Sequence, residues 1–156
     1  MMIGIQEIPV ERIEEFWPLH IKYLVEDGII EDGEDVEYFS GEEYRSVIKA
    51  QMCRDNDRHR MVYFVRNGER IGAAQFNIYH GEDGKCFILD FWVFPRFRGG
   101  GTGHECFESL ERYTRALGAR RYEINSTKEA SVRFWKSLGF VENGCDEDGM
   151  PLFVRS

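Results

Sequence analysis

The chain has 156 residues, of which 42% are hydrophobic and 14% aromatic, and this is enough for one hydrophobic core. No segment approaches the roughly 20 apolar residues of a membrane-spanning helix, and no basic patch precedes an apolar run at the N-terminus, so the sequence disfavours a membrane protein and a secreted one. The net charge of −8 is concentrated in residues 1–50, which hold 13 acidic and 4 basic side chains and disfavour nucleic acid as a partner. We therefore predict a single cytoplasmic domain over residues 1–156.

The cysteines are spaced too widely for a metal-binding motif. They are Cys53, Cys86, Cys106 and Cys145, and no two of them form a CxxC pair. Each has apolar neighbours, which in a cytosolic protein is typical of free buried thiols rather than of disulfides or zinc ligands. We expect no metal and no disulfide.

The first part of the chain predicts a short strand and then a helix. Residues 2–8 alternate enough for a strand, and residues 9–28 have apolar side chains at helical spacing. Pro18 lies inside this helix, so we expect a kink or a break near Trp17.

A second helix is expected after an acidic segment at residues 26–37. Ser40 is placed like an N-cap, and Glu43 follows at the capping-box spacing, so the helix is predicted over residues 41–54. The acidic segment itself has two interpretations. It is either a solvated loop that keeps the protein soluble or a rim that attracts a cationic substrate.

Three antiparallel strands follow in a meander. Residues 60–67 and 70–80 flank Asn67 and Gly68, a dipeptide that favours a tight hairpin, and residues 85–95 form the third strand after another glycine-containing turn.

The last part of the chain predicts two further helices and three further strands. In order, these are a helix at 102–117, a strand at 119–126, a helix at 128–138 and a hairpin from the segments 140–144 and 151–156. Gly118 and Gly139 end the two helices. The order indicates an α/β (α+β) fold with a mixed, mostly antiparallel central sheet of about six or seven strands, flanked by about four helices.

The stretch "RFRGGGTGHE", residues 96–105, holds four glycines at a strand-to-helix turn. The first turn of a helix has free N–H groups and a partial positive charge, and glycines let an anion approach the backbone, so this turn predicts a diphosphate site. A P-loop would need Lys and Ser or Thr after its last glycine, whereas His104 and Glu105 follow Gly103. A Rossmann fingerprint would need a glycine at position 104 and a βαβ unit, so both nucleotide patterns fail.

A third pattern fits this stretch. Residues 98–103 read R-x-x-G-x-G, with Val93 and Pro95 five and three residues before Arg98. This resembles the coenzyme-A-binding motif of the GNAT superfamily, the acetyl-CoA-dependent N-acetyltransferases. The segment "SVRFWKSLGF", residues 131–140, resembles that family's later motif, in which a helix carries a Phe-Tyr pair and ends in Gly-Phe. The order of elements is also similar, so the resemblance covers nearly the whole chain.

The resemblance implies which residues hold acetyl-CoA, the acyl donor. In the family, backbone amides of the glycine loop bind the pyrophosphate. Amides of the preceding strand, which separates from its neighbour at a bulge, hold the pantetheine arm and the acetyl carbonyl, as preorganised donors for a developing negative charge. The loop residues implied here are Arg98, Gly99, Gly100, Gly101, Thr102, Gly103 and His104, and the strand residues are Phe91, Trp92 and Val93. The implied reaction is direct attack of an amine on the thioester.

The family's usual general acid is the tyrosine of the Phe-Tyr pair, and this position holds Trp135. An indole N–H can donate a hydrogen bond to sulfur but does not titrate at a useful pH. Ser131 lies four residues earlier on the same helix face, where it is either a relay through water or a small packing residue. The asparagine that is usual in the family three residues ahead of it is replaced by Lys128.

Asp90 is the first choice for a general base, because it is an acid in an otherwise apolar strand beside the carbonyl-binding segment. The alternative is that Asp90 faces away and pairs with an arginine such as Arg121. His80 and His104 are further candidates, each with an interpretation as a surface residue or a helix-terminus contact.

The acceptor implied by the resemblance is a primary amine of a small molecule or a peptide. Aromatic residues of the two early helices, together with the acids of 26–37, would suit a cationic amine. The alternative function is a non-catalytic acyl-CoA-binding or regulatory module, which the loss of the tyrosine favours. The sequence does not decide between a monomer and a homodimer.

Overall fold

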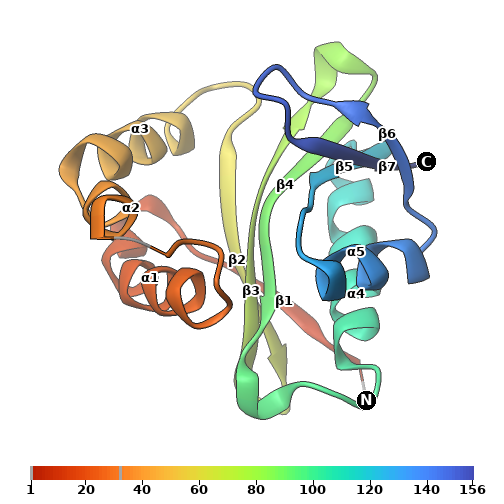
Figure 1. The fold of residues 1–156 in the computed structure, drawn as a ribbon, viewed down its shortest axis with the longest axis horizontal. Helices are drawn as coiled ribbons and strands as arrows, with labels where there is room; N and C mark the ends of the chain where they lie inside the picture. Colours follow the sequence, from red (N-terminus) through yellow and green to blue (C-terminus); the bar gives the residue numbers. More distant parts are fainter. Residues whose placement is uncertain (1, 32) are drawn as a thin grey trace.

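The computed structural model describes residues 2–31 and 33–156, and its central feature is a seven-stranded sheet (Figure 1). The strands are β1 (Gly4–Glu7), β2 (His59–Arg66), β3 (Glu69–Tyr79), β4 (Lys85–Val93), β5 (Arg121–Asn125), β6 (Val141–Cys145) and β7 (Pro151–Arg155). The α-helices are α1 (Phe16–Glu26), α2 (Gly33–Phe39), α3 (Glu42–Met52), α4 (Thr102–Ala116) and α5 (Glu129–Ser137). Short 3-10 helices occupy Val10–Glu15, His80–Glu82 and Pro95–Phe97.

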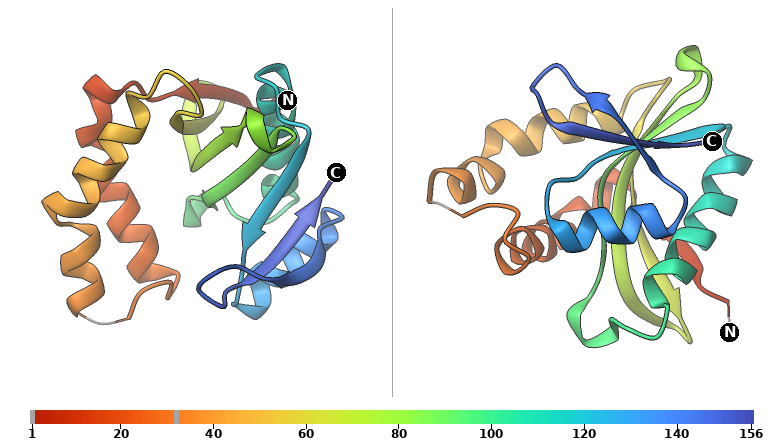
Figure 2. Two further views of the ribbon diagram at one scale, coloured as in Figure 1. Left: turned by 90° about the horizontal axis from the view of Figure 1, so that it is seen from above. Right: turned by 45° about the vertical axis from the view of Figure 1, so that its right-hand side comes forward.

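The sheet separates two groups of helices, each with its own core. Its strand order is β1-β2-β3-β4-β5-β7-β6, and all neighbours pair antiparallel except β4 and β5. Helices α1, α2 and α3 lie together on one side of the sheet, and α4 and α5 lie on the other (Figures 1 and 2). One core includes Phe107 and Trp135, and the other includes Phe16 and Trp92. The predicted mixed, mostly antiparallel fold is confirmed.

The hairpin between β2 and β3 has the predicted turn. Asn67 and Gly68 both adopt positive φ, at 55° and 76°, which is the backbone of the two-residue turn that this dipeptide favours.

The segment before α3 differs from the prediction in two ways. Residues Gly33–Phe39 form the short helix α2, which overlaps the second half of the acidic segment 26–37 that the sequence indicated as a loop. The predicted capping box at Ser40 is wrong, because the N-cap of α3 is Gly41 and no side chain caps this helix. The Ser40 hydroxyl instead donates to the carbonyl of Val36 at 2.6 Å, so this serine belongs to the end of α2. Of the acidic segment, Asp32 lies outside the described residues.

The expected break near Trp17 is present. A 3-10 helix precedes α1, which starts at Phe16 and places Pro18 in its first turn. A helix needs no backbone donor there, so the proline is accommodated without a kink inside the helix.

A bulge in β4 changes which side of the sheet its side chains face. Gln75 pairs with Asp90 and Phe76 with Ile88, so Leu89 is the extra residue. Ile88 belongs to the core under α4 and α5, whereas Trp92 belongs to the core under α1 and α3. Without the extra residue, Ile88, Asp90 and Trp92 would all share one face. The bulge therefore turns Asp90 toward α1.

The two parallel strands β4 and β5 separate soon after they begin to pair. Their pairing covers Lys85–Phe87 and Arg121–Glu123, and β4 then continues to Val93 paired with β3 but not with β5. The second half of β4 thus has a free edge in the described chain, facing α5.

The cysteines are free, but not all of them are buried. Cys86 and Cys106 lie in the core as predicted, whereas Cys53 and Cys145 are exposed because they lie at the end of α3 and in the edge strand β6. Of the helices in the described chain, none is both long and apolar enough to cross a membrane.

Candidate functional site

A cavity of about 560 Å³ opens between the end of β4, the start of α4 and one face of α5. Of the residues predicted to form the site, it is lined by Phe91, Trp92, Val93, Arg98, Gly99, Gly101, Thr102, Gly103, His104, Ser131 and Trp135. Gly100 and Asp90 are not among its lining residues. Two segments 30 residues apart in the sequence thus border one space.

The glycine loop adopts a backbone that other residues rarely take. Gly99, Gly100 and Gly101 have φ of 95°, 63° and 82°, three consecutive left-handed residues directly before α4. A Cβ at any of the three would meet nothing within 4 Å, so glycine is required there by conformation, and the space above the loop is open. The amide groups that begin α4 face this open space with the positive end of a 15-residue helix.

Gly103 has a different role from the three glycines before it. A Cβ at this position would lie 2.8 Å from Cε1 of Phe134. Gly103 therefore permits α4 and α5 to approach each other closely at the floor of the cavity.

Arg98 connects the glycine loop to α1. Its Nε donates to the carbonyl of Val93 at 2.7 Å, and its two terminal nitrogens donate to the carboxylate of Asp27 at 3.2 and 2.9 Å. Since Asp27 is the C-cap of α1, this bidentate pair joins the two sides of the cavity.

Trp135 is a packing residue that also lines the cavity. The residue is 6% exposed, and its ring centroid lies 5.0 to 5.8 Å from those of four aromatic rings. These rings belong to Phe91, Phe107, Phe134 and Phe140. The indole is therefore held in a fixed position at the cavity wall.

Ser131 carries a hydroxyl whose orientation is constrained. Ser126 donates to Ser131 Oγ at 2.7 Å, and Ser131 lines the cavity. Because Ser131 accepts this bond, its own O–H is free to donate elsewhere.

Asp90 faces α1 and is held by two donors. Its Oδ2 accepts from Nε2 of His20 at 3.0 Å and from Nε2 of Gln75 at 2.7 Å. The alternative pairing with Arg121 does not occur, because Arg121 bonds to Glu123 at 2.5 Å and to the carbonyl of Glu82. Asp90 therefore belongs to a polar cluster under α1, and its side chain keeps 15% exposure.

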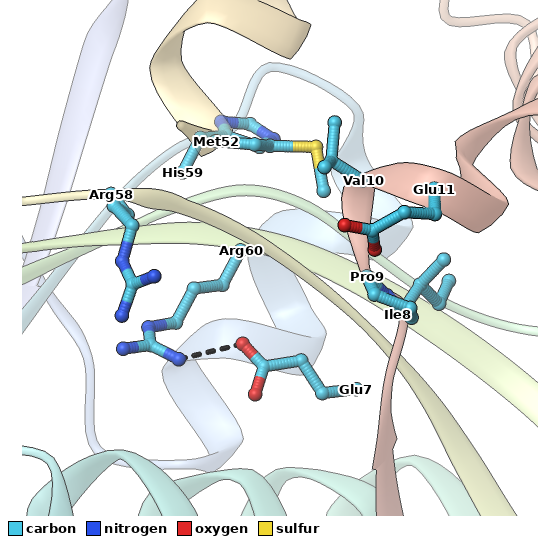
Figure 3. Close-up of a pocket in the computed structure, with 9 residues that line it drawn as sticks. All are labelled: Glu7, Ile8, Pro9, Val10, Glu11, Met52, Arg58, His59 and Arg60. Carbon is cyan, nitrogen blue, oxygen red and sulfur yellow. Dashed lines mark hydrogen bonds and ion pairs between the residues drawn. The ribbon is translucent and has the colours of Figure 1, made fainter. Parts of the chain in front are cut away.

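The cluster continues across the sheet to a second cavity. His59 Nε2 donates to Gln75 Oε1 at 2.6 Å, and burial lowers the pKa of His59, which keeps the ring neutral. His59 lines a cavity of about 510 Å³ beside β1, where Arg60 reaches Glu7 at 2.6 Å (Figure 3). None of the residues predicted for acetyl-CoA or for catalysis lines this second cavity.

Aromatic rings enclose the polar cluster. Tyr23 stacks on Trp92 with ring centroids 4.3 Å apart, and Tyr44 stacks on His20 at 6.0 Å. Burial, together with the charge of Asp90, raises the pKa of both tyrosines above the ordinary value, so both phenols stay protonated.

The two other histidines considered as bases lie apart from Asp90. His80 bonds to the carboxylate of Asp57 at 3.2 Å and to the carbonyl of Leu117 at 3.1 Å, on a different surface from the first cavity. His104 lines the first cavity, and its Nε2 contacts Ser137 Oγ at 2.9 Å.

Sequence reasoning missed His20 and Gln75. His20 has helical spacing with Phe16 and Leu24, so a polar ring on an otherwise buried face was visible in the sequence. Gln75 likewise stands in an apolar strand. Their partnership with Asp90 was not visible, because it joins three elements far apart in the chain.

Comparison with known proteins gives one family match and many similar structures. Residues 19–140 match the acetyltransferase (GNAT) family. A comparison with curated proteins finds no match.

Three solved structures illustrate the shared fold. The PaiA N-acetyltransferase from Thermoplasma acidophilum, solved with coenzyme A, is 14% identical with a TM-score of 0.73, over 100% of this chain and 99% of that one. An acetyltransferase from Thermus thermophilus is 15% identical with a TM-score of 0.68, over 99% and 97%. An acetyltransferase from Salmonella typhimurium that modifies the N-terminal serine of a 50S ribosomal subunit protein is 15% identical with a TM-score of 0.64, over 99% and 95%.

These likenesses are of fold, and the family match covers 122 residues, from 19 to 140, which is most of the chain. The glycine loop, the separated strands β4 and β5, and the family match agree: this chain belongs to the GNAT family of acetyltransferases.

Proposed function

We propose that the protein is an N-acetyltransferase that moves the acetyl group of acetyl-CoA to a primary amine. The observation that carries this proposal is the run of three left-handed glycines, open to solvent, that begins α4 at the mouth of the first cavity. We propose that residues 1–156 act as one such domain, in the cytoplasm.

The loop from Arg98 to His104 would hold the pyrophosphate through backbone amides, in the open space over Gly99–Gly101. The free edge of β4 at Phe91, Trp92 and Val93 would hold the pantetheine arm and polarise the acetyl carbonyl. The CoA-bound structure of the PaiA N-acetyltransferase supports a CoA site on this fold.

The proposed reaction is one direct transfer. Asp90 removes a proton from the ammonium group of the acceptor, and the neutral amine then attacks the carbonyl carbon of the thioester. The C–S bond breaks, the electron pair leaves with sulfur, and the second amine proton ends on the thiol. Ser131 and Trp135 lie where they would contact that sulfur, Ser131 as a donor through its free O–H and Trp135 through its indole N–H.

The proposed acceptor is cationic. The carboxylate of Asp90 lies among the rings of Tyr23, Tyr44 and Trp92, an arrangement that suits an alkylammonium group. Two carboxylates of the acidic segment 26–37 already have basic partners, since Asp27 binds Arg98 and Glu31 lies 3.9 Å from Lys128. Asp90 is therefore the group on which this proposal rests. The Salmonella relative that modifies a protein N-terminus supports an amine acceptor.

Two measurements test the proposal. Acetyl-CoA and CoA should each raise the melting temperature, because a ligand that binds the native state stabilises it. Release of CoA thiol should then be measured against a panel of small amines and peptide N-termini. Absence of any thermal shift would contradict the proposal as a whole.

The second candidate is a non-catalytic acyl-CoA-binding module, and Trp135 at the position of the usual acid favours it. A thermal shift without thiol release for every amine in the panel would support the module. Turnover with any amine would exclude it.

A further inference from the structure

His20 is a polar ring buried in an aromatic setting on α1. Its residue is 1% exposed, and its ring stacks between those of Phe16, at 5.5 Å, and Tyr44, at 6.0 Å. Burial of a polar ring is unfavourable unless its nitrogens are bonded. In the described chain, Nδ1 has no partner, and Nε2 lies 3.0 Å from Oδ2 of Asp90 and 3.3 Å from Nε2 of Gln75. Because a carboxylate accepts, Nε2 carries the proton of this hydrogen bond.

The bond from His20 is one part of an ordered chain of donors. His59 donates to the carbonyl oxygen of Gln75, which turns the Gln75 amide nitrogen toward Asp90. Asp90 Oδ2 thus receives two hydrogen bonds, from His20 and from Gln75. Within the described residues, Oδ1 accepts no hydrogen bond, so it is the oxygen left for a ligand.

From this geometry we propose that His20 is a positioning residue for acetyl transfer, which fixes the orientation of the Asp90 carboxylate so that Oδ1 is the oxygen left for the amine. It acts on the amine through Asp90 and touches neither substrate. The inference rests on the proposed function, in which Asp90 removes the proton of the acceptor.

The proton balance follows from this arrangement. The N–H bond of the ammonium group breaks and an O–H bond forms at Oδ1, so the carboxylate of Asp90 takes up the proton. After product release, Asp90 returns the proton to solvent and the pair is ready again. The Nε2–H of His20 donates to Oδ2 and takes no part in this transfer.

The other titratable groups around Asp90 are neutral or paired. Tyr23 on α1 and Tyr44 on α3 have pKa values raised by burial, and His59 on β2 has a pKa lowered by burial. Beyond Tyr23, Asp27 and Arg98 form an ion pair. His20 is thus the ionisable side chain that bonds directly to Asp90.

Two substitutions at one position separate the hydrogen bond from the packing. His20→Gln keeps an N–H donor near Nε2 and loses the ring, whereas His20→Phe keeps a ring that can stack on Phe16 and Tyr44 and loses the donor. We expect His20→Phe to lower kcat by about 10- to 100-fold, since hydrogen bonds to charged groups are worth that much. The acidic limb of its pH profile should move to higher pH, and His20→Gln should recover most of kcat and the original limb.

The opposite ranking would overturn the proposal. If His20→Phe keeps wild-type kcat while His20→Gln is impaired, His20 serves packing. If both are impaired alike with an unmoved acidic limb, its role is structural. Both variants should show the wild-type thermal shift with acetyl-CoA, which confirms that the donor site is intact.

A second measurement does not depend on turnover. In the free wild-type protein, the imidazole nitrogen NMR spectrum should show His20 protonated at Nε2, with a proton resonance that moves upfield in Asp90→Asn. Protonation of His20 at Nδ1 alone would overturn the inference. If the wild type acetylates no amine, the proposed function fails, and this spectrum still decides whether the pair exists.

Discussion

The candidate sites on the two sides of β4 use different parts of the chain: one uses mainly backbone groups and the other uses side chains. Toward α4 and α5, the candidate donor site consists mainly of backbone: three left-handed glycines, the start of a helix and a free strand edge. Toward α1 and α3, the candidate acceptor site consists of side chains, with His20, Gln75 and Asp90 bonded to one another. The one-residue bulge at Leu89 places Asp90 on the α1 side of the sheet, whereas Ile88 lies on the side of α4 and α5.

This difference predicts how each side should respond to substitution. A backbone site depends on conformation, so many side chains around it can vary while the glycines cannot. A side-chain cluster depends on each hydrogen-bonding partner, because a buried polar group that loses its partner is destabilising. Substitutions on the donor side should therefore change the binding of acetyl-CoA, and substitutions on the acceptor side should change turnover.

Gly101→Glu should have the largest effect, on the donor side. The substitution forces a φ of 82° on a residue with a Cβ and places a carboxylate in the open space assigned to pyrophosphate. At a ligand concentration of about 100 Kd, the wild type should gain about 2.7 kcal/mol from acetyl-CoA, and the variant should gain none. Differential scanning fluorimetry measures this shift.

Gly144→Glu is the matched control for this experiment. Gly144 has a φ of 68° in β6, with nothing within 4 Å of a Cβ, so the backbone strain is similar but the position is remote. This variant should keep the acetyl-CoA shift. A Gly101→Glu variant that still binds acetyl-CoA would show that the loop does not hold the phosphate.

Asp90→Asn should affect the acceptor side alone. An amide cannot take the amine proton, so kcat/KM should fall by about 10²- to 10⁴-fold while the acetyl-CoA shift remains. Asp57→Asn is the control, since Asp57 is an acid bonded to His80 on another surface and should leave kcat/KM near wild type. Equal kcat/KM for Asp90→Asn and the wild type would remove Asp90 from the reaction.

The same contrast decides how much the sequence could predict. Backbone requirements appear in the sequence as runs of consecutive residues, so the sequence indicated the glycine loop at Gly99–Gly103 and the hairpin at Asn67-Gly68. The acceptor cluster could be predicted only in part. Asp90 was recognisable as an acid in an apolar strand, but its partners His20 and Gln75 come from other elements.

A local sequence pattern also gave a wrong prediction at a residue that lies between two helices. Ser40 and Glu43 have capping-box spacing, yet the hydroxyl of Ser40 bonds backward to Val36, because an unexpected helix ends there. A bulge in this strand was expected from the family resemblance, whereas its position at Leu89 and its effect on the side that Asp90 faces required the observed register.

Trp135→Tyr should have a modest effect, and it tests whether the departure from the family motif matters. The indole packs among four aromatic rings, so the smaller phenol should lower the free energy of unfolding by about 1–2 kcal/mol. The acetyl-CoA shift should remain. We expect kcat to change by less than about 3-fold, because a thiolate is a fair leaving group without an acid.

A large gain in kcat for Trp135→Tyr would contradict this view. It would show that protonation of the thiolate limits the rate in the wild type. Urea unfolding gives the stability, and steady-state thiol release gives kcat. Trp17→Tyr serves as a packing control, since Trp17 is buried in the other core.

The smallest effect concerns the far end of the acceptor cluster and its dependence on pH. Burial lowers the pKa of His59, so below its unfolded pKa of about 6.5 the unfolded chain binds more protons than the native protein. Stability should therefore fall as pH decreases from 7.5 to 5.5, with at most about 1.4 kcal/mol due to this residue. In His59→Gln this part of the slope should disappear.

His80→Gln provides a control with the opposite sign. A hydrogen bond to the carbonyl of Leu117, with Asp57 beside it, raises the pKa of His80, so this histidine stabilises the native state at low pH and that contribution is lost as pH rises. Its removal should make the pH slope slightly steeper. Urea unfolding at pH 5.5 and 7.5 measures all three proteins. If the free energy of unfolding depends on pH equally in His59→Gln and the wild type, His59 has the same pKa in the folded and the unfolded chain. A buried neutral ring at position 59 would then not be what orients Gln75 toward Asp90.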